Sequence, residues 1–363
     1  MRKVFITGGA GFIGCNTAAY FSKKGDEVTI FDNFSRDGTR ENAEWLSTEC
    51  PNVKVIEGDI RDATALEAAM AGAEVVIHLA AQVAVTTSVT DPKNDFDVNA
   101  LGSFNVVEAC RKLNPMPIVL YASTNKVYGG MEDAKIVERN GRYAYENLTT
   151  GVSEERGLDF HSPYGCSKGC ADQYFRDYFR IYGLRTVVLR QSCIYGYRQF
   201  GVEDQGWVAW FAIAAMFGKE LTIFGDGKQV RDVLFIEDLV RAYDMAVENI
   251  EKTAGQVYNI GGGVDKTLSL LELLDYLEKF FEKKVERKFT DWRPGDQQVY
   301  ISDIRKAKIE FGWEPAFNPA DGLNKLIDWI SKNESLFQNF SGKLREQKNI
   351  RQENEQLEKQ KIV

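Results

Sequence analysis

Short apolar runs alternate along the chain with longer segments whose apolar residues recur at helical spacing. The runs lie at 4–7, 27–31, 53–57, 74–79, 118–121 and 186–190, and the helical segments at 11–24, 39–49, 62–70, 95–113 and 163–183. Strand–helix alternation builds a parallel sheet from βαβ units, and strands that are apolar on both faces are typical of a sheet covered by helices. The pattern therefore predicts an α/β fold with a doubly wound parallel sheet.

This regular alternation weakens after residue 190. We expect two later segments, 232–235 with the helix after Glu237 and 257–260, to return to the main sheet. Residues 1–190 then form one large domain, interleaved with a smaller lobe built mainly from 191–340.

Two segments fall outside the alternation. The polar stretch 130–160 is expected to be a surface insertion near the ends of the strands. Residues 341–363 are rich in Lys, Arg, Glu and Gln, a composition that predicts a charged tail that is disordered or forms a solvated helix.

Composition excludes several functions. The formal net charge of −8 disfavours a nucleic acid partner. The six cysteines form no CxxC pair and the only histidines are His78, expected to be structural, and His161, so no metal site is predicted. No apolar run is long enough to span a membrane and the first residues do not resemble a signal peptide, so we expect a cytoplasmic protein without a membrane partner.

A glycine loop directly follows the first predicted strand and opens the first predicted helix. It reads Gly8-Gly9-Ala10-Gly11-Phe12-Ile13-Gly14. Glycines let the backbone turn tightly and approach a pyrophosphate, which the helix N-terminus then stabilises. The spacing differs from the simplest fingerprint, GxGxxG, and a plain glycine turn is the alternative. We expect residues 1–190 to be a Rossmann-type domain that binds its cofactor through Gly8, Gly11, Phe12, Ile13 and Gly14.

Residues at the ends of the next strands complete the predicted cofactor site. A carboxylate at Asp32 would accept both hydroxyls of the adenosine ribose and repel a 2′-phosphate, so the sequence favours NAD over NADP, although nearby Arg36 weakens this preference. A simple turn role for Asp32 and ordinary packing at the fourth strand are the alternatives. The further residues expected to contact the cofactor are Asn33, Asp59, Ile60, Leu79 and Ala80.

Tyr164 and Lys168 lie four residues apart in a predicted helix and therefore share one face. Oxidising an alcohol requires removal of its proton, and an ordinary tyrosine, with a pKa of about 10, is a poor base at neutral pH. A nearby ammonium and a positively charged nicotinamide would both favour the phenolate. We expect Tyr164 to be the base and Lys168 to assist it and hold the nicotinamide ribose. A solvated helix face is the alternative.

Three further side chains could take part. Thr124 ends the fifth strand, where its hydroxyl could bind the reacting alcohol, and Ser123 competes for that role. Asn99 is expected either to bridge backbone groups or to contact the cofactor.

These motifs resemble those of the extended short-chain dehydrogenase/reductase family of nucleotide-sugar enzymes. The resemblance implies that the family's triad is Thr124, Tyr164 and Lys168, and that Arg231 and Arg293 bind a diphosphate, for which guanidinium forks are suited. It also implies a homo-oligomer, a dimer or tetramer. The resemblance extends to about residue 335 and includes GGAGFIG at 8–14, HLAAQ at 78–82, STNKVYG at 123–129, SPYGCSK at 162–168 and GDGKQVRDVLFIEDL at 225–239.

Within the family, the unusual stretches 123–129 and 195–211 resemble members that invert C2 of a CDP-linked dideoxy sugar. Tyr197 and Cys193 stand where commoner members carry proline and asparagine, so those members' nucleotide contacts do not transfer. Asn125-Lys126 replaces the acid pair of the dehydratases, so dehydration is not expected. Both residues could contact the sugar or stabilise the backbone turn. The residues expected to contact the substrate are Ser88, Asn125, Gln205, Arg231 and Arg293.

The expected reaction is transient oxidation at C2 by tightly held NAD, followed by hydride return to the opposite face. Oxidation at C4 of a 3,6-dideoxy ring would acidify C3 and C5 but not C2. The alternatives are a UDP-sugar 4-epimerase, an NADH-consuming nucleotide-sugar reductase, and a dinucleotide-binding protein without catalytic activity.

Overall fold

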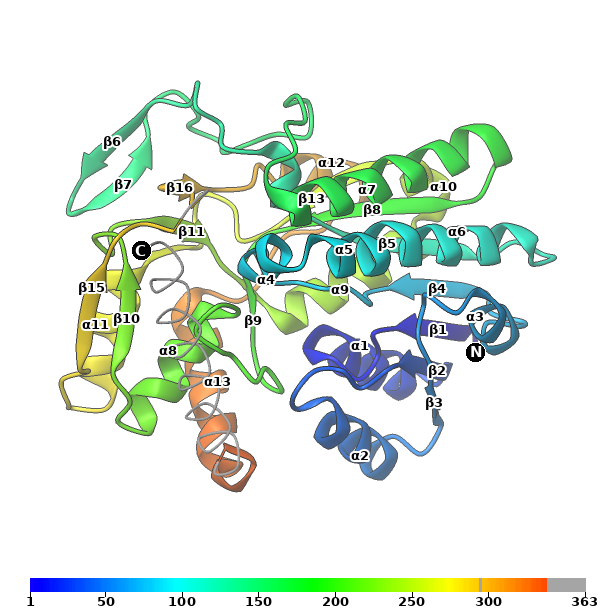
Figure 1. Cartoon of the computed structure of the whole chain (residues 1–363), viewed down its shortest axis with the longest axis horizontal. Coiled ribbons are helices and arrows are strands. Elements are labelled where there is room, and N and C mark those ends of the chain that lie inside the picture. Colours follow the sequence, from blue (N-terminus) through cyan, green and yellow to red (C-terminus); the bar gives the residue numbers. More distant parts are fainter. Residues whose placement is uncertain (294–295, 338–363) are drawn as a thin grey trace, which may run out of the picture.

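A seven-stranded parallel sheet forms the centre of the protein (Figure 1). The computed structural model describes residues 1–293 and 296–337, so the predicted tail 341–363 lies outside the described residues. The sheet order is β13-β8-β5-β4-β1-β2-β3, which confirms the predicted doubly wound fold. Its strands are β1 (Lys3–Thr7), β2 (Glu27–Asp32), β3 (Val53–Glu57), β4 (Val75–His78), β5 (Ile118–Thr124), β8 (Thr186–Gln191) and β13 (Val257–Ile260). The strand order reverses at β1 and β4, and ligands of such sheets bind outside the carboxyl ends at this point.

Helices cover both faces of this sheet. Successive strand residues point to opposite sides, and the strands are apolar on both sides, so each face must be buried. Val4 and Ile6 of β1 belong to the apolar core under α1 (Phe12–Lys23), α2 (Thr39–Glu49) and α9 (Ile236–Glu248). Phe5 between them belongs to the core under α3 (Ala63–Ala69), α6 (Ser103–Lys112) and α7 (Ser162–Tyr182). None of the helices in the described ranges is both long and apolar enough to cross a membrane.

The predicted helix at 95–113 is interrupted. It consists of α5 (Pro92–Phe96), one wider π-helical stretch (Asp97–Gly102) and α6, and α4 (Val85–Thr90) precedes it. Such π-turns are rare and frequently occur at functional sites.

The predicted return of 232–235 to the main sheet is wrong. Asp232 ends β11 (Val230–Asp232), which pairs with β14 (Thr267–Ser269) and β16 (Val299–Tyr300). β12 (Leu234–Phe235) pairs only with β9 (Ile194–Tyr195). Residues 232–235 are buried. A buried strand is mostly apolar whichever strand it pairs with, so the apolar run could not identify its partner. The other predicted return, β13, does join the main sheet beside β8.

The lobe beyond β8 combines small sheets with short helices. Strands β10 (Leu221–Phe224) and β15 (Arg287–Thr290) pair in parallel beside α8 (Trp207–Met216) and α11 (Leu270–Phe280) (Figure 1). The polar insertion carries the hairpin of β6 (Ile136–Arg139) and β7 (Arg142–Tyr145), which lies beside β11 and β16. The remaining helices are a 3₁₀ turn (Asn125–Tyr128), α10 (Ile250–Thr253), α12 (Arg305–Phe311) and α13 (Pro319–Lys332).

Candidate functional site

The glycine loop joins β1 to α1 at the carboxyl edge of the sheet. Gly8 has a φ of +67°, and a Cβ there would lie 2.6 Å from the backbone nitrogen of Ala80. A Cβ at Gly14 would lie 2.2 Å from the carbonyl oxygen of Gly8. Only glycine fits these two positions, because the β4 loop and the start of α1 approach the loop so closely.

The first turn of α1 presents free backbone donors. Gly11 is the N-cap, and no side chain caps the helix. The N–H groups of Phe12, Ile13 and Gly14 therefore lack the partners that a helix interior would provide. Uncapped N–H groups with no side chain in front of them suit a pyrophosphate, so this loop fits a dinucleotide.

Asp32 ends β2 and ties the glycine loop to the next turn. Its carboxylate accepts hydrogen bonds from the N–H of Ala10 (3.0 Å) and of Phe34 (2.9 Å). Burial raises the pKa of Asp32, and these hydrogen bonds oppose the rise. Each carboxylate oxygen can accept a second hydrogen bond, so the turn role and the predicted ribose contact are compatible.

The further residues expected to contact the cofactor differ in their surroundings. Asn33 donates to the Asp59 carboxylate (2.9 Å), and a hydrogen bond from Arg61 holds the pKa of Asp59 down at about 2. Ile60, by contrast, packs into the core and is 4% exposed, so only its backbone could meet a cofactor. The predicted neighbours after β4, Leu79 and Ala80, are half-buried.

The structure separates the two candidate hydroxyls at the end of β5. The Ser123 hydroxyl is buried and donates to the Asp172 carboxylate (2.7 Å). The Thr124 hydroxyl instead faces Tyr164 and favours the ionised phenol by lowering its pKa. The predicted role of Thr124 stays a prediction, while the Ser123 hydroxyl is already engaged by Asp172.

Tyr164 lies in the first turn of α7, next to Pro163. Burial raises the pKa of Tyr164 to about 12. The hydrogen bond from Thr124 and the charge of Arg36 act in the opposite direction, while Asp95 adds to the rise. The phenol is therefore protonated at neutral pH until a positive charge is placed beside it.

Lys168 lies one turn further along α7 and is 4% exposed. Its ammonium donates to the carbonyl oxygen of Ala122 (2.7 Å) and lies 4.4 Å from the centre of the Tyr121 ring. Burial lowers the pKa of Lys168 to about 7, although Asp172 and Asp95 favour its charged form. The expected stabilisation of the Tyr164 phenolate by Lys168 stays a prediction, and in this structure the amine is bonded to the end of β5.

One buried carboxylate at the site was missed from the sequence. Asp95 accepts hydrogen bonds from the Ser167 hydroxyl (2.5 Å) and the Asn99 amide (3.0 Å) and is fully buried. Asn99 also bonds both backbone groups of Gln82 (2.9 Å each), which agrees with its bridging role. Its predicted cofactor contact stays a prediction. The signal for Asp95 was its position one helical turn before Asn99.

Ser88 was expected to contact the substrate, and the structure does not favour this. Its hydroxyl is fully buried, donates to the Val85 carbonyl (2.7 Å) and accepts the N–H of Tyr164 (3.2 Å). It therefore anchors the start of α7 behind the phenol.

Arg231 and Asn125 lie on the lobe side of the triad. Arg231, in β11, is 8% exposed and donates to the Asp296 carboxylate (2.9 Å). Asn125 is buried directly after Thr124 and accepts a hydrogen bond from its hydroxyl (3.4 Å). Neither arrangement excludes the predicted substrate contacts.

The other two predicted substrate residues belong to one linked group. Gln205 accepts a hydrogen bond from Arg36 of the β2–α2 loop, which joins the large domain to the lobe. Arg293 pairs with Asp204 (3.1 Å) and lies 3.8 Å from the centre of the Phe224 ring. These pairings place Arg293, which follows β15, beside the lobe loop that contains Asp204 and Gln205.

The two positions that depart from the commoner family pattern differ in their surroundings. Tyr197 packs against Phe235 and donates to Glu237 (3.2 Å), so its role is to stabilise the packing of the core. Cys193 lies near Arg231 and Lys126, whose charges act on its thiol. Burial raises the pKa of Cys193, so this thiol is neutral.

His78 is structural, as predicted. Its ring bonds the hydroxyls of Thr7 (2.6 Å) and Ser103 (2.8 Å) inside the core, and burial lowers its pKa. Within 1–293 and 296–337, no three His, Cys, Asp or Glu side chains are grouped as metal ligands.

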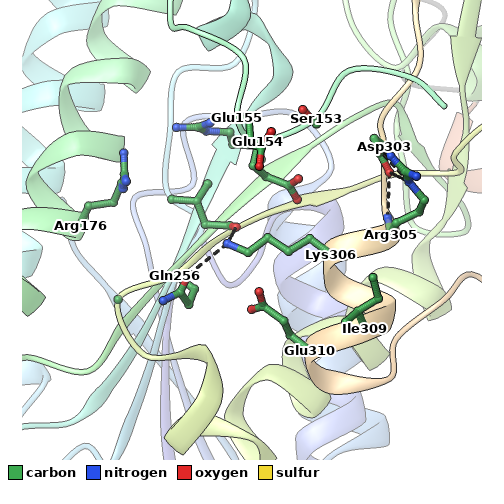
Figure 2. Close-up of a pocket in the computed structure, with 13 residues that line it drawn as sticks. Ser153, Glu154, Glu155, Arg176, Gln256, Asp303, Arg305, Lys306, Ile309 and Glu310 are labelled. Carbon is green, nitrogen blue, oxygen red and sulfur yellow. Dashed lines mark hydrogen bonds and ion pairs between the residues drawn. The ribbon is translucent and has the colours of Figure 1, made fainter. Parts of the chain in front are cut away.

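A separate polar groove of about 530 Å³ runs along the free edge of β13 (Figure 2). Lys306 donates to the Val257 carbonyl (2.9 Å), and Glu154 accepts the N–H of Asn259 (2.7 Å). Charged side chains thus form hydrogen bonds with backbone groups at the edge of this strand, which protects it from pairing with another chain. None of the predicted site residues lines this groove.

The chain is similar to known proteins over most of its length. The chain is 44% identical to a CDP-paratose 2-epimerase of Salmonella typhi over 91% of this chain and 99% of that protein. A putative UDP-glucose 4-epimerase of Methanocaldococcus jannaschii is 31% identical over 91% of this chain and 99% of its own length.

Among solved structures, a UDP-glucose 4-epimerase from Thermotoga maritima with UDP-glucose has a TM-score of 0.78, with 31% identity over 91% of this chain and 99% of that one. A dTDP-glucose 4,6-dehydratase from Streptomyces venezuelae, solved with NAD, has a TM-score of 0.79, with 27% identity over 93% and 99% of the two chains. The model of the NAD dependent epimerase/dehydratase family matches residues 4–261, which confirms NAD as the cofactor. The chain therefore belongs to the NAD-dependent epimerase/dehydratase family.

Proposed function

We propose that this protein inverts C2 of a CDP-linked 3,6-dideoxyhexose and so interconverts CDP-paratose and CDP-tyvelose. The observation that carries the proposal is the assembly of Thr124, Tyr164 and Lys168 at the carboxyl end of β5 in a chain 44% identical to a CDP-paratose 2-epimerase. A complete base and hydroxyl set also argues against a protein that only binds a dinucleotide, since binding needs no base.

Each residue of the triad has a separate task in this reaction. NAD, when bound, accepts and returns a hydride, and its positively charged ring favours the Tyr164 phenolate. Tyr164 removes the proton of the C2 hydroxyl and later returns it. Thr124, which faces Tyr164, binds the same oxygen as alcohol and as ketone. Lys168 holds the nicotinamide ribose.

Inversion requires the sugar to turn while the nucleotide stays bound. Arg231 and Arg293 are proposed to hold the diphosphate, because a guanidinium donates two parallel hydrogen bonds to phosphate oxygens. Asn125 and Gln205 are proposed to contact the sugar. With the diphosphate held by these arginines, the 2-keto sugar would be free to turn over, so that hydride return to its other face would give the epimer.

We also propose that the protein is a homo-oligomer that works in the cytoplasm. Large apolar side chains are exposed together on the outer side of the large domain, and such patches commonly mark interfaces. They are Phe96, Leu101, Phe104, Tyr174, Ile181 and Tyr182 on α5, α6, α7 and the π-turn. The six cysteines are all free thiols, which suits a reducing compartment.

Product analysis tests the reaction. Purified protein is incubated with CDP-paratose in deuterated water, and the sugar is followed by NMR together with the absorbance of NADH. We expect CDP-tyvelose, no deuterium at C2 and no net NADH change. Deuterium at C2 would contradict hydride return, and stoichiometric NADH consumption would indicate a reductase.

The second candidate is a UDP-sugar 4-epimerase, which the 31% identity to the Methanocaldococcus and Thermotoga proteins favours. The same incubation with UDP-glucose distinguishes the two. Conversion of UDP-glucose without conversion of either CDP-sugar would replace the first proposal by the second.

A further inference from the structure

Lys126 is the second residue after the catalytic threonine, and its side chain reaches toward the lobe. Its backbone N–H donates to the Thr124 hydroxyl (3.3 Å), so its backbone is held at the reacting end of β5. Its ammonium donates to the side-chain oxygen of Gln297 (3.3 Å), and Gln297 in turn donates to the Gly129 carbonyl (2.6 Å). Lys126 therefore spans from the catalytic hydroxyl to the segment that follows Arg293.

The charges around this ammonium are unbalanced. Arg231 of β11 is a second cation beside it. Among the residues that the structure describes, Asp296 is the one carboxylate acting on it, and Asp296 already pairs with Arg231 (2.9 Å). Cys193, the other titratable group facing it, is a neutral thiol. Burial and the Arg231 charge together lower the pKa of Lys126 to about 8. A buried cation and a half-buried cation beside a single carboxylate are costly unless an anion joins them.

The chemistry of the substrate supplies such an anion in the right place. In a nucleotide-sugar, C2 is bonded to the anomeric carbon that carries the β-phosphate, whereas C4 lies across the ring. When the C2 hydroxyl sits at Thr124 and Tyr164, the β-phosphate must therefore lie next to the triad. When C4 reacts instead, the phosphate is displaced by the width of the sugar ring.

We propose that Lys126, together with Arg231, binds the β-phosphate and thereby selects C2 for oxidation. This inference rests on the proposed function, and it adds the residue that determines which carbon reacts. Its position directly after the catalytic hydroxyl makes the phosphate subsite and the hydride-transfer site neighbours.

The test compares nucleotides with and without the β-phosphate. Isothermal titration measures binding of CDP and of CMP to the full-length protein and to the variants Lys126→Met and Lys126→Arg. Because a hydrogen bond to a charged group contributes about 1.5–3 kcal/mol, Lys126→Met should weaken CDP binding about 10- to 100-fold and leave CMP binding unchanged. Lys126→Arg should keep CDP affinity within about threefold of wild type. Lys308→Met, at an exposed lysine paired with Glu314, is the matched control and should change neither.

Equal losses for CDP and CMP, or no loss for CDP, would overturn the phosphate contact. The pH dependence gives a readout that a structural role would not produce. The phosphate groups no longer titrate above about pH 7, since their second pKa is about 6. CDP affinity of the wild type should therefore fall as the pH rises through about 8, where Lys126 loses its proton, and Lys126→Arg should abolish this fall. An unchanged profile in the arginine variant would contradict the assignment.

Failure of the proposed function is distinguishable from failure of this inference. If the protein prefers uridine, the same comparison with UDP and UMP tests Lys126 without reference to the base. If the wild type epimerises C4 of UDP-glucose and not C2 of a CDP-sugar, the selection of C2 is overturned even when Lys126 distinguishes UDP from UMP.

Discussion

Replacement of Tyr164 by phenylalanine isolates the chemical role of one oxygen atom. The ring stays in place, because the backbone N–H at this position remains bonded to the Ser88 hydroxyl (3.2 Å). The hydroxyl of Thr124 keeps its contacts with the Lys126 N–H and the Asn125 amide oxygen. Losing one hydrogen bond should lower the free energy of unfolding by only about 0.5–1.5 kcal/mol.

The expected loss of activity follows from the pKa of this phenol. With a pKa of about 12, Tyr164 of the free enzyme is about 10⁻⁴ ionised at pH 8, a deficit of about 5 kcal/mol that the charged cofactor must offset. Because a raised pKa keeps the base protonated, kcat/KM of the wild type should increase with pH until the phenol ionises. Without the oxygen, kcat should fall about 10²- to 10⁴-fold, the usual contribution of a general base.

Initial rates of CDP-paratose conversion, measured by chromatography from about pH 6 to about pH 9, test this expectation. KM should change little, because the arginines proposed to hold the diphosphate are untouched. Tyr174→Phe, at an exposed position of the same helix, is the matched control and should retain wild-type turnover. Full activity of Tyr164→Phe would refute the assignment of the base.

Three further substitutions test the surroundings of the triad. Gly8→Ala should abolish NAD binding and lower the melting temperature, because its Cβ would lie 2.6 Å from backbone, whereas Gly183→Ala, with a similar φ of +69° but open space, should affect NAD binding little. Calorimetry that finds normal NAD affinity in Gly8→Ala would contradict the packing argument. Asp32→Ala removes the acceptor of two loop N–H groups and should raise the Kd for NAD at least about tenfold. It should also reduce the preference for NAD over NADP. Unchanged affinities for both cofactors would exclude the predicted contact of Asp32 with the ribose. Asp95→Asn removes a negative charge that raises the pKa of Tyr164, so the rising limb of the kcat/KM profile should move to lower pH, and an unshifted profile would show that Asp95 is only structural.

Local regularities were sufficient to predict the main sheet and to place the glycine loop, Thr124, Tyr164 and Lys168 at its carboxyl edge. The period of apolar residues identifies the strands of the main sheet and most of the helices between them, and parallel strands bring their carboxyl ends to one edge. The glycine loop and Thr124 follow strands directly, and Tyr164 and Lys168 share a helix face by spacing alone. These relations depend on neighbours in the chain, so the amino-acid sequence determined them.

Only the tertiary structure decided which groups meet across the chain. Ser88 bonds the backbone of Tyr164 across 76 residues, and Asp95 bonds Ser167 across 72. The partner strand of 232–235 was likewise undetermined, because a buried apolar run can pair with any buried neighbour. The lowered pKa of Lys168 arises from burial, and this burial depends on how β5 and α7 pack together. Contacts between distant segments leave no periodic trace in the sequence, and only the packed fold shows them.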